Sequence, residues 1–149
     1  NGRPFFAKMI NPKRRRKIVR GKTNLEGIQL LELRKINEPP KGQILFKSKV
    51  EIIVETDDQI NDRMLNNLEL LDMPLQIHVD GKKSSPKNIY KIRSKKISSK
   101  LLKVNIHADG GIPIKSFIQS SYVVPNFTDL LKSECKCVQF DFKKIDVMS

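Results

Sequence analysis

The feature that most constrains the fold of this chain is an alternation of apolar and charged residues between Phe46 and Glu55. Successive side chains of a β-strand point to opposite faces, so the alternation predicts a strand with one buried side and one solvent-facing side. The apolar face carries Phe46, Val50, Ile52 and Val54, and the charged face carries Lys47, Lys49, Glu51 and Glu55. A sheet with one apolar face has to be covered, which favours a layer of helices packed on it.

Shorter alternations of the same kind predict the other strands. They are expected at Leu75–Val79, at Tyr90–Ile92 and Leu102–Ile106 around a turn near Ser98-Ser99, and at Val138–Phe142. Another strand is expected over Arg3–Ile10. The segment Leu25–Ile36 fits a helix or a strand equally well by periodicity, and Pro39-Pro40 then forces a loop.

Three helices are predicted between these strands. The clearest has Ile60, Met64, Leu68 and Leu71 along one face. Thr56 and Gln59 stand before it at capping-box spacing. Shorter helices are expected at Ile114–Gln119 and at Phe127–Lys132, the latter with Asn126 as its N-cap. Together, these strands and helices predict an α+β protein with a mixed, largely antiparallel sheet and flanking helices. We expect a single domain over residues 1–149.

The charge balance points to a polyanionic partner. Against 16 Asp and Glu stand 29 Lys and Arg, a net charge of +13. Nucleic acid is the first candidate for the partner, and an anionic membrane surface is the second. No apolar run approaches the roughly 18 residues of a transmembrane helix. The two cysteines, Cys135 and Cys137, give no disulfide framework, which fits a reducing compartment. We therefore expect the protein in the cytoplasm, or in the nucleus if the source is eukaryotic.

The densest run of positive charge follows the first predicted strand. It comprises Lys13, Arg14, Arg15, Arg16, Lys17, Arg20 and Lys22. Several cations in one short stretch suit the regularly spaced phosphates of RNA, although such a run is also typical of a solvated face or a localisation signal. Lys82 and Lys83 are predicted to extend the RNA-binding surface, together with Lys87, Arg93, Lys95 and Lys96.

Three segments of the chain resemble a known family in their order. The first segment is Asn-Gly-Arg-Pro-Phe-Phe at Asn1–Phe6, which is followed by Asn11-Pro12 and a run of basic residues. This resembles the stretch after the catalytic loop in the Pus-ten family of archaeal and eukaryotic tRNA pseudouridine synthases. Gly110–Ile118 is similar to the family's Gly-Thr-Tyr-Ile-Lys/Arg motif. Pro125–Asp141 resembles its closing segment. The resemblance spans nearly the whole chain and implies a pseudouridine-synthase-like fold, of which this chain is the C-terminal portion of the catalytic domain.

The resemblance also implies roles for two residues. Lys115 matches the basic residue that pairs with the catalytic aspartate, and Ile114 matches the apolar residue that packs under the target base. A buried carboxylate nucleophile needs a cation nearby to stay ionised. The alternative is that Lys115 is a solvated helix lysine and the two preceding glycines only form a turn. The family's aspartate lies in an upstream Gly-Arg-Glu-Asp-type loop that this chain lacks. The chain alone is therefore expected to be inactive, and its missing N-terminal part is a candidate partner.

Two departures from the family pattern leave a second function open. Val50 stands where the family has a tyrosine that stacks on the target uracil, and Pro113 replaces the tyrosine of the glycine-rich motif. The resemblance implies isomerisation of uridine in the TΨC arm of tRNA, with tRNA or another structured RNA as the partner, no membrane, and no metal or organic cofactor. The departures favour the alternative, a non-catalytic RNA-binding module of a ribonucleoprotein. Cys135 and Cys137 are interpreted as free thiols, because a structural zinc site needs four ligands.

Overall fold

The computed structural model describes residues 7–8, 23–81, 85–119 and 122–148. It divides into two compact units, Gly2–Ile44 and Leu45–Ser149. In the first unit, β1 (Thr23–Leu25) and β2 (Ile28–Leu30) form an antiparallel hairpin. Of the two alternatives left open for Leu25–Ile36, the structure has the strand, which is limited to the end of β1 and to β2, and no helix. The strand predicted over Arg3–Ile10 lies outside the described residues apart from positions 7 and 8. The single domain over 1–149 stays a prediction.

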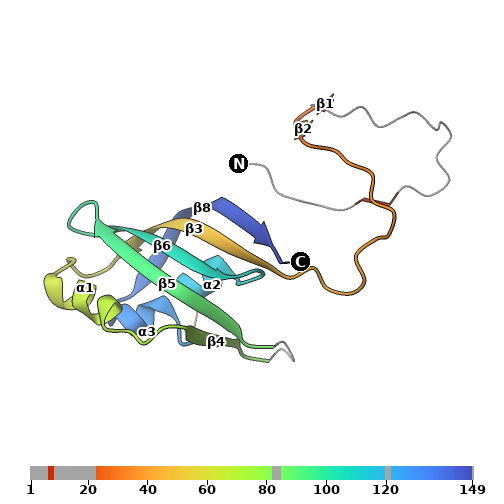
Figure 1. Ribbon diagram of the computed structural model, residues 1–149. Coiled ribbons are helices and arrows are strands. Elements are labelled where there is room, and N and C mark those ends of the chain that lie inside the picture. The colour runs from red at the N-terminus through yellow and green to blue at the C-terminus, as the bar shows by residue number, and fades with distance from the viewer. Residues whose placement is uncertain (1–6, 9–22, 82–84, 120–121, 149) are drawn as a thin grey trace. The chain divides into compact units, whose positions relative to one another are not determined.

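The Leu45–Ser149 unit is built on a six-stranded sheet in which all neighbouring strands are antiparallel. The order across the sheet is β7 (Val123–Val124), β4 (Leu75–Val79), β5 (Lys87–Lys96), β6 (Leu101–Asp109), β3 (Phe46–Thr56) and β8 (Cys135–Val147) (Figure 1). The α+β class is confirmed, and so are the predicted strands of this unit.

Three helices lie on one face of the sheet, namely α1 (Asp62–Glu69), α2 (Ile114–Gln119) and α3 (Phe127–Leu131) (Figure 1). Ile52 of β3 is fully buried beneath them, and the fully buried rings of Phe117 and Phe127 meet edge to face at 6.1 Å. Each such side chain contributes about 1.5–3 kcal/mol by leaving water. No helix in the described ranges covers the other face of the sheet, and none there is long and apolar enough to span a membrane.

The start of α1 differs from the capping-box prediction. Thr56 still pairs with Cys135 as the last residue of β3, and its hydroxyl donates to the Asp58 carbonyl at 2.7 Å. The N-cap is Asn61, whose side-chain oxygen accepts from the Met64 amide at 3.0 Å. The capping box at Thr56 and Gln59 is wrong because the long β3–β8 pairing holds Thr56 in the sheet. Asn126, in contrast, caps α3 as predicted.

A β-bulge in β5 places Tyr90 and Ile92, which a regular strand would put on one face, on opposite faces of the sheet. The pairing of β5 with β6 shifts register between Ile89 and Lys91, so Tyr90 is an extra residue. Ile89 is buried, whereas the Tyr90 ring lies 5.6 Å from the His107 ring on the uncovered face. His107 pairs with Lys91 on one side and Lys49 on the other, so its side chain also belongs to the uncovered face.

The two glycines after β6 have structural reasons to be glycine. A Cβ at Gly110 would overlap the ring of Phe46, and the Gly110 amide donates to the Phe46 carbonyl at 2.7 Å. Gly111 has φ +81°, in the left-handed region that favours glycine. The turn between β6 and α2 therefore explains both glycines without a ligand.

We expect Gly110→Ala to lower the free energy of unfolding by about 1–2 kcal/mol, because overpacking displaces the Phe46 ring. Thermal or urea unfolding of the variant measures this decrease. The Phe46→Leu, Gly110→Ala double variant should be destabilised by less than the sum of the two single variants, since the smaller side chain removes the overlap. Strict additivity would contradict this account of the turn.

Candidate functional site

The predicted catalytic pair lies at the start of α2. Ile114 is only 5% exposed and belongs to the hydrophobic core, whereas Lys115 is exposed. A helix turns about 100° per residue, so neighbours on α2 face different surroundings. The structure therefore separates the two residues: Ile114 anchors the helix, and Lys115 is available to a partner.

Lys115 lies close to the helix-facing side of β8. Gln119, one helical turn further on, accepts a hydrogen bond from the Cys137 amide at 3.0 Å. Burial raises the pKa of the Cys137 thiol, and the positive charge of Lys115 partly offsets that increase. Helix α2 thus holds the Lys115 ammonium group beside the last strand of the sheet.

Strand β8 is an edge of the sheet with exposed apolar side chains. It pairs with β3 on one side, and no described strand of this unit pairs with its other side. Val138 is 52% exposed and Phe140 is 43% exposed, and the Phe140 and Phe142 rings meet at 6.0 Å. A long edge strand with apolar side chains is a surface that proteins normally cover.

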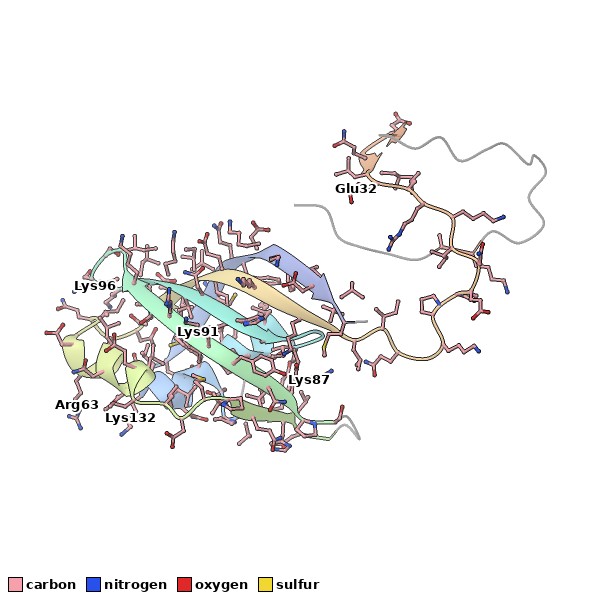
Figure 2. The ribbon with its side chains drawn as sticks, in the orientation of Figure 1. Glu32, Arg63, Lys87, Lys91, Lys96 and Lys132 are labelled. Carbon is pink, nitrogen blue, oxygen red and sulfur yellow. The ribbon has the colours of Figure 1, made fainter. Side chains whose placement is uncertain are left out.

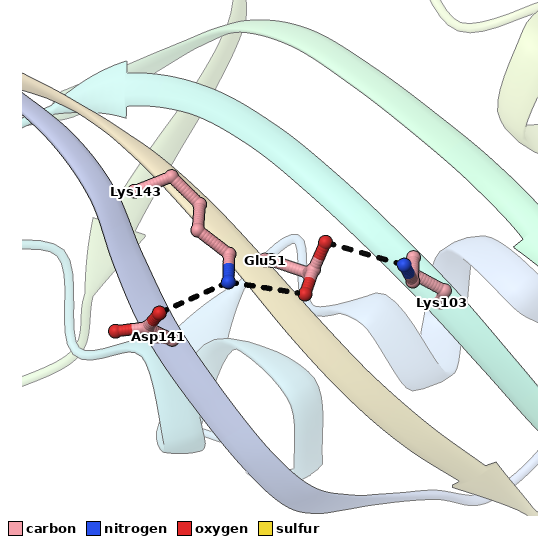
Figure 3. Close-up of polar contacts among 4 residues, drawn as sticks. All are labelled: Glu51, Lys103, Asp141 and Lys143. Carbon is pink, nitrogen blue, oxygen red and sulfur yellow. Dashed lines mark ion pairs between the residues drawn. The ribbon is translucent and has the colours of Figure 1, made fainter.

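No described carboxylate forms an ion pair with Lys115. The ion pairs of the described chain lie on the uncovered side of the sheet, where Glu51 of β3 contacts both Lys103 of β6 and Lys143 of β8 at 3.4 Å (Figure 3). Burial tends to raise the pKa of the Glu51 carboxyl, but the hydrogen bonds from both lysines outweigh it and lower the pKa. Among the described residues, Lys115 is therefore an exposed cation without a carboxylate in ion-pair contact.

Several predicted RNA-binding residues lie outside the described residues. These are Lys13, Arg14, Arg15, Arg16, Lys17, Arg20, Lys22, Lys82 and Lys83. Among the others, the Lys96 ammonium group donates to the Ile60 carbonyl at 3.0 Å, which ties β5 to the start of the helical layer. Arg93 and Lys95 are exposed on β5, the strand on which Figure 2 labels Lys91.

The sequence did not predict the polar cluster around Asp109. Its carboxylate accepts hydrogen bonds from the Tyr90 hydroxyl at 2.7 Å, from the Asn88 amide at 2.8 Å and from the Asn88 side chain at 3.3 Å. Burial tends to raise the Asp109 pKa, but these donors and the charge of Lys87 lower it overall. The Lys47 ammonium group lies 4.0 Å from the centre of the Tyr90 ring. The Asp109 carboxylate thus already accepts hydrogen bonds from Asn88 and Tyr90 within the protein. These hydrogen bonds hold the bulge of β5 against the end of β6.

The two positions at which tyrosines are missing have different surroundings. Val50 is 1% exposed within the core and pairs with Ile106 and Phe142 across the sheet. Its side chain cannot reach a base. Pro113 is half-buried, and its carbonyl accepts the Phe117 amide at 2.8 Å in the first turn of α2. Neither position carries an aromatic ring that could stack on a base.

The two cysteines are free, as interpreted from the sequence. Cys135 is buried, and burial raises the pKa of its thiol to about 11. Among the described residues, no group of three or more His, Cys, Asp or Glu side chains is placed to hold a metal ion.

Comparison with known proteins gives the class of this chain. A family model described as "Pus10, C-terminal" matches residues 1–146. The chain therefore belongs to the Pus10 C-terminal family, and the resemblance seen in the sequence is confirmed.

Curated relatives carry the name tRNA pseudouridine synthase Pus10. The chain is 33% identical to the protein of Nitrosopumilus maritimus over 147 residues, which cover 98% of this chain and 38% of the relative. It is 31% identical to that of Cenarchaeum symbiosum, over 98% of this chain and 36% of the relative. A relative from Methanocaldococcus jannaschii is 24% identical over 97% of this chain. The chain thus spans somewhat more than a third of the length of the relatives it matches.

We expect Asp109→Asn to destabilise the fold by about 1 kcal/mol, because the amide has one acceptor oxygen where the carboxylate has two. The folded-state pKa of Asp109 lies below its ordinary value of 3.8. Its contribution is therefore present above that value and disappears as the pH falls through the lower, folded-state pKa. The stability difference between wild type and variant, measured by urea unfolding, should shrink between about pH 6 and about pH 3. A difference that stays constant over this range would show that the charge contributes nothing.

Proposed function

We propose that the intact protein containing this chain is a tRNA pseudouridine synthase that isomerises uridine in the TΨC arm. The observation that carries the proposal is the match of residues 1–146 to the Pus10 C-terminal family. The names of the relatives support tRNA as the substrate, and the net charge of +13 suits a polyanionic partner.

In this proposal Lys115 is the positive charge that keeps the nucleophilic carboxylate ionised. Its exposure and its lack of an ion pair to any described carboxylate leave it available for that contact. An adjacent cation lowers the pKa of a carboxyl group and so favours its nucleophilic form. Ile114 acts indirectly, because its burial holds α2 against the core and fixes where Lys115 projects.

The carboxylate is supplied by the N-terminal part of the same protein, which we place at the edge of β8. That edge has backbone groups that no described strand pairs, exposed Val138 and Phe140, and Lys115 beside it. A strand or loop docked there would cover the apolar side chains and bring an acidic residue to the lysine. The site is then shared between two parts of one chain.

A second candidate function is a non-catalytic RNA-binding module. It is favoured by the absence of a stacking ring at Val50, which is buried, and at Pro113. Removing an aromatic contact from a base costs about 1–3 kcal/mol of stacking. The two functions differ in one measurement, the appearance of pseudouridine in tRNA incubated with the intact protein.

In the intact protein, we expect Lys115→Ala to lower kcat by about 10²–10³ and to change tRNA affinity by less than about twofold, because the lysine acts on the nucleophile rather than on phosphates. Pseudouridine mapping under single-turnover conditions and filter binding measure the two effects. Lys100→Ala, an exposed charge in the β5–β6 turn, is the matched control and should change neither. Weaker binding with an unchanged rate would assign Lys115 to phosphate contact instead.

Replacement of Arg14, Arg15 and Arg16 by Ala tests the basic run. If these side chains contact phosphates, the dependence of log K on log salt should become shallower by roughly 0.7 to 0.9 for each phosphate that is no longer neutralised. Fluorescence titrations of tRNA at several salt concentrations give the slope. The run is only a solvated segment if the slope of the triple variant matches that of the wild type.

A further inference from the structure

The uncovered face of the sheet carries an ordered array of positive charges. Cross-strand pairing of β5, β6 and β3 aligns their outward residues in three rows: Lys91, His107 and Lys49; Arg93, Asn105 and Glu51; Lys95, Lys103 and Ile53. We call these nine residues the basic face. They hold five Lys or Arg side chains against one carboxylate, and β5 itself has five cations and no acid.

Most of these cations have no acidic partner in the part of the chain that the structure describes. The one carboxylate, Glu51, is already shared by Lys103 and Lys143 (Figure 3). Within the described residues, no carboxylate forms an ion pair with Lys49, Lys91, Arg93 or Lys95. Lys95 also stands directly opposite Lys103 across the β5–β6 pair, and like charges in that position destabilise a sheet. An anion bound on this face would relieve that repulsion.

The spacing of the array suits a repeating anion. Alternate residues of a strand lie roughly 6.6–6.8 Å apart on one face, and neighbouring strands lie about 4.8 Å apart. Lys91, Arg93 and Lys95 thus form a line of three cations on an open surface, which fits a chain of phosphates better than one small anion. The Tyr90 ring, already flanked by Lys47 and His107, is occupied, so contact with the backbone of a nucleic acid is favoured over stacking of its bases.

We propose that the basic face binds the phosphate backbone of RNA, as a second contact separate from the site at Lys115. Lys115 projects from the helical layer beside β8, whereas the basic face is the side of the sheet on which no described helix lies (Figure 1). The RNA segment held there is not the one that carries the target base. This inference rests on the proposed function only in taking RNA as the polyanion.

The test compares two double variants of the intact protein that each remove two positive charges. Lys91→Gln with Arg93→Gln alters the basic face, and Arg63→Gln with Lys132→Gln alters exposed residues of the helical layer (Figure 2). Binding of an unmodified tRNA transcript is titrated over a range of salt, with vesicles of anionic phospholipid as the second probe. Steady-state kinetics give kcat and KM.

The proposal expects the β5 double variant to bind tRNA about three- to tenfold more weakly, with a salt slope reduced by roughly 0.7 to 0.9 for each phosphate that is no longer neutralised. The helical-layer variant should match the wild type. For an active enzyme, the β5 variant should raise KM and leave kcat unchanged, unlike Lys115→Ala.

Three results would overturn the proposal. Equally weakened binding in both double variants would show a general effect of net charge. Loss of vesicle binding with unchanged tRNA binding would assign the face to a membrane. Aggregation of the β5 variant with unchanged tRNA affinity would assign its cations to protecting an exposed strand from pairing with other copies. Absence of pseudouridine formation in the wild type would refute the proposed function and leave the binding comparison valid.

Discussion

The fold depends on the pairing of β3 with strands on both sides. β3 exchanges hydrogen bonds with β6 along nine aligned residue pairs and with β8 along eleven. Val50, Ile52 and Val54 are 1%, 0% and 0% exposed under the helices, so this strand supplies the centre of the core. The same register turns its charged residues to the opposite side. One strand therefore fixes both the apolar layer that holds the helices and the charged surface that meets solvent.

The elements with a strong local pattern were predictable from the sequence. The strand from Phe46 follows from alternation, and the start of α3 follows from Asn126, whose side chain can satisfy a free amide of the first turn. The start of α1 was not predictable in the same way. Thr56 and Gln59 form an acceptable capping box, but the long-range pairing of Thr56 with Cys135 overrides it. A local signal fails where a partner about eighty positions away in the sequence decides the conformation.

Only part of the candidate site was predictable, because contacts between residues distant in the sequence also determine its arrangement. The exposure of Lys115 and the burial of Ile114 follow from helical geometry once α2 packs on the sheet. The family resemblance had instead assigned Ile114 to packing under the target base and Lys115 to pairing with the catalytic aspartate. The rows of the basic face could not be read from the sequence. Lys91 and Lys49 become neighbours of His107 only through the register of three strands, and that register depends on the bulge at Tyr90.

The two ends of the Leu45–Ser149 unit meet at one point of the sheet. The Met148 amide donates to the Leu45 carbonyl at 2.9 Å, next to the paired residues Phe46 and Val147. Because its two ends are adjacent, such a unit can be inserted at one position of a longer polypeptide, with the segments that enter and leave it side by side. It is also topologically suited to circular permutation: joining these ends and cutting the turn at Ser98-Ser99 would leave every strand pair of the sheet in place.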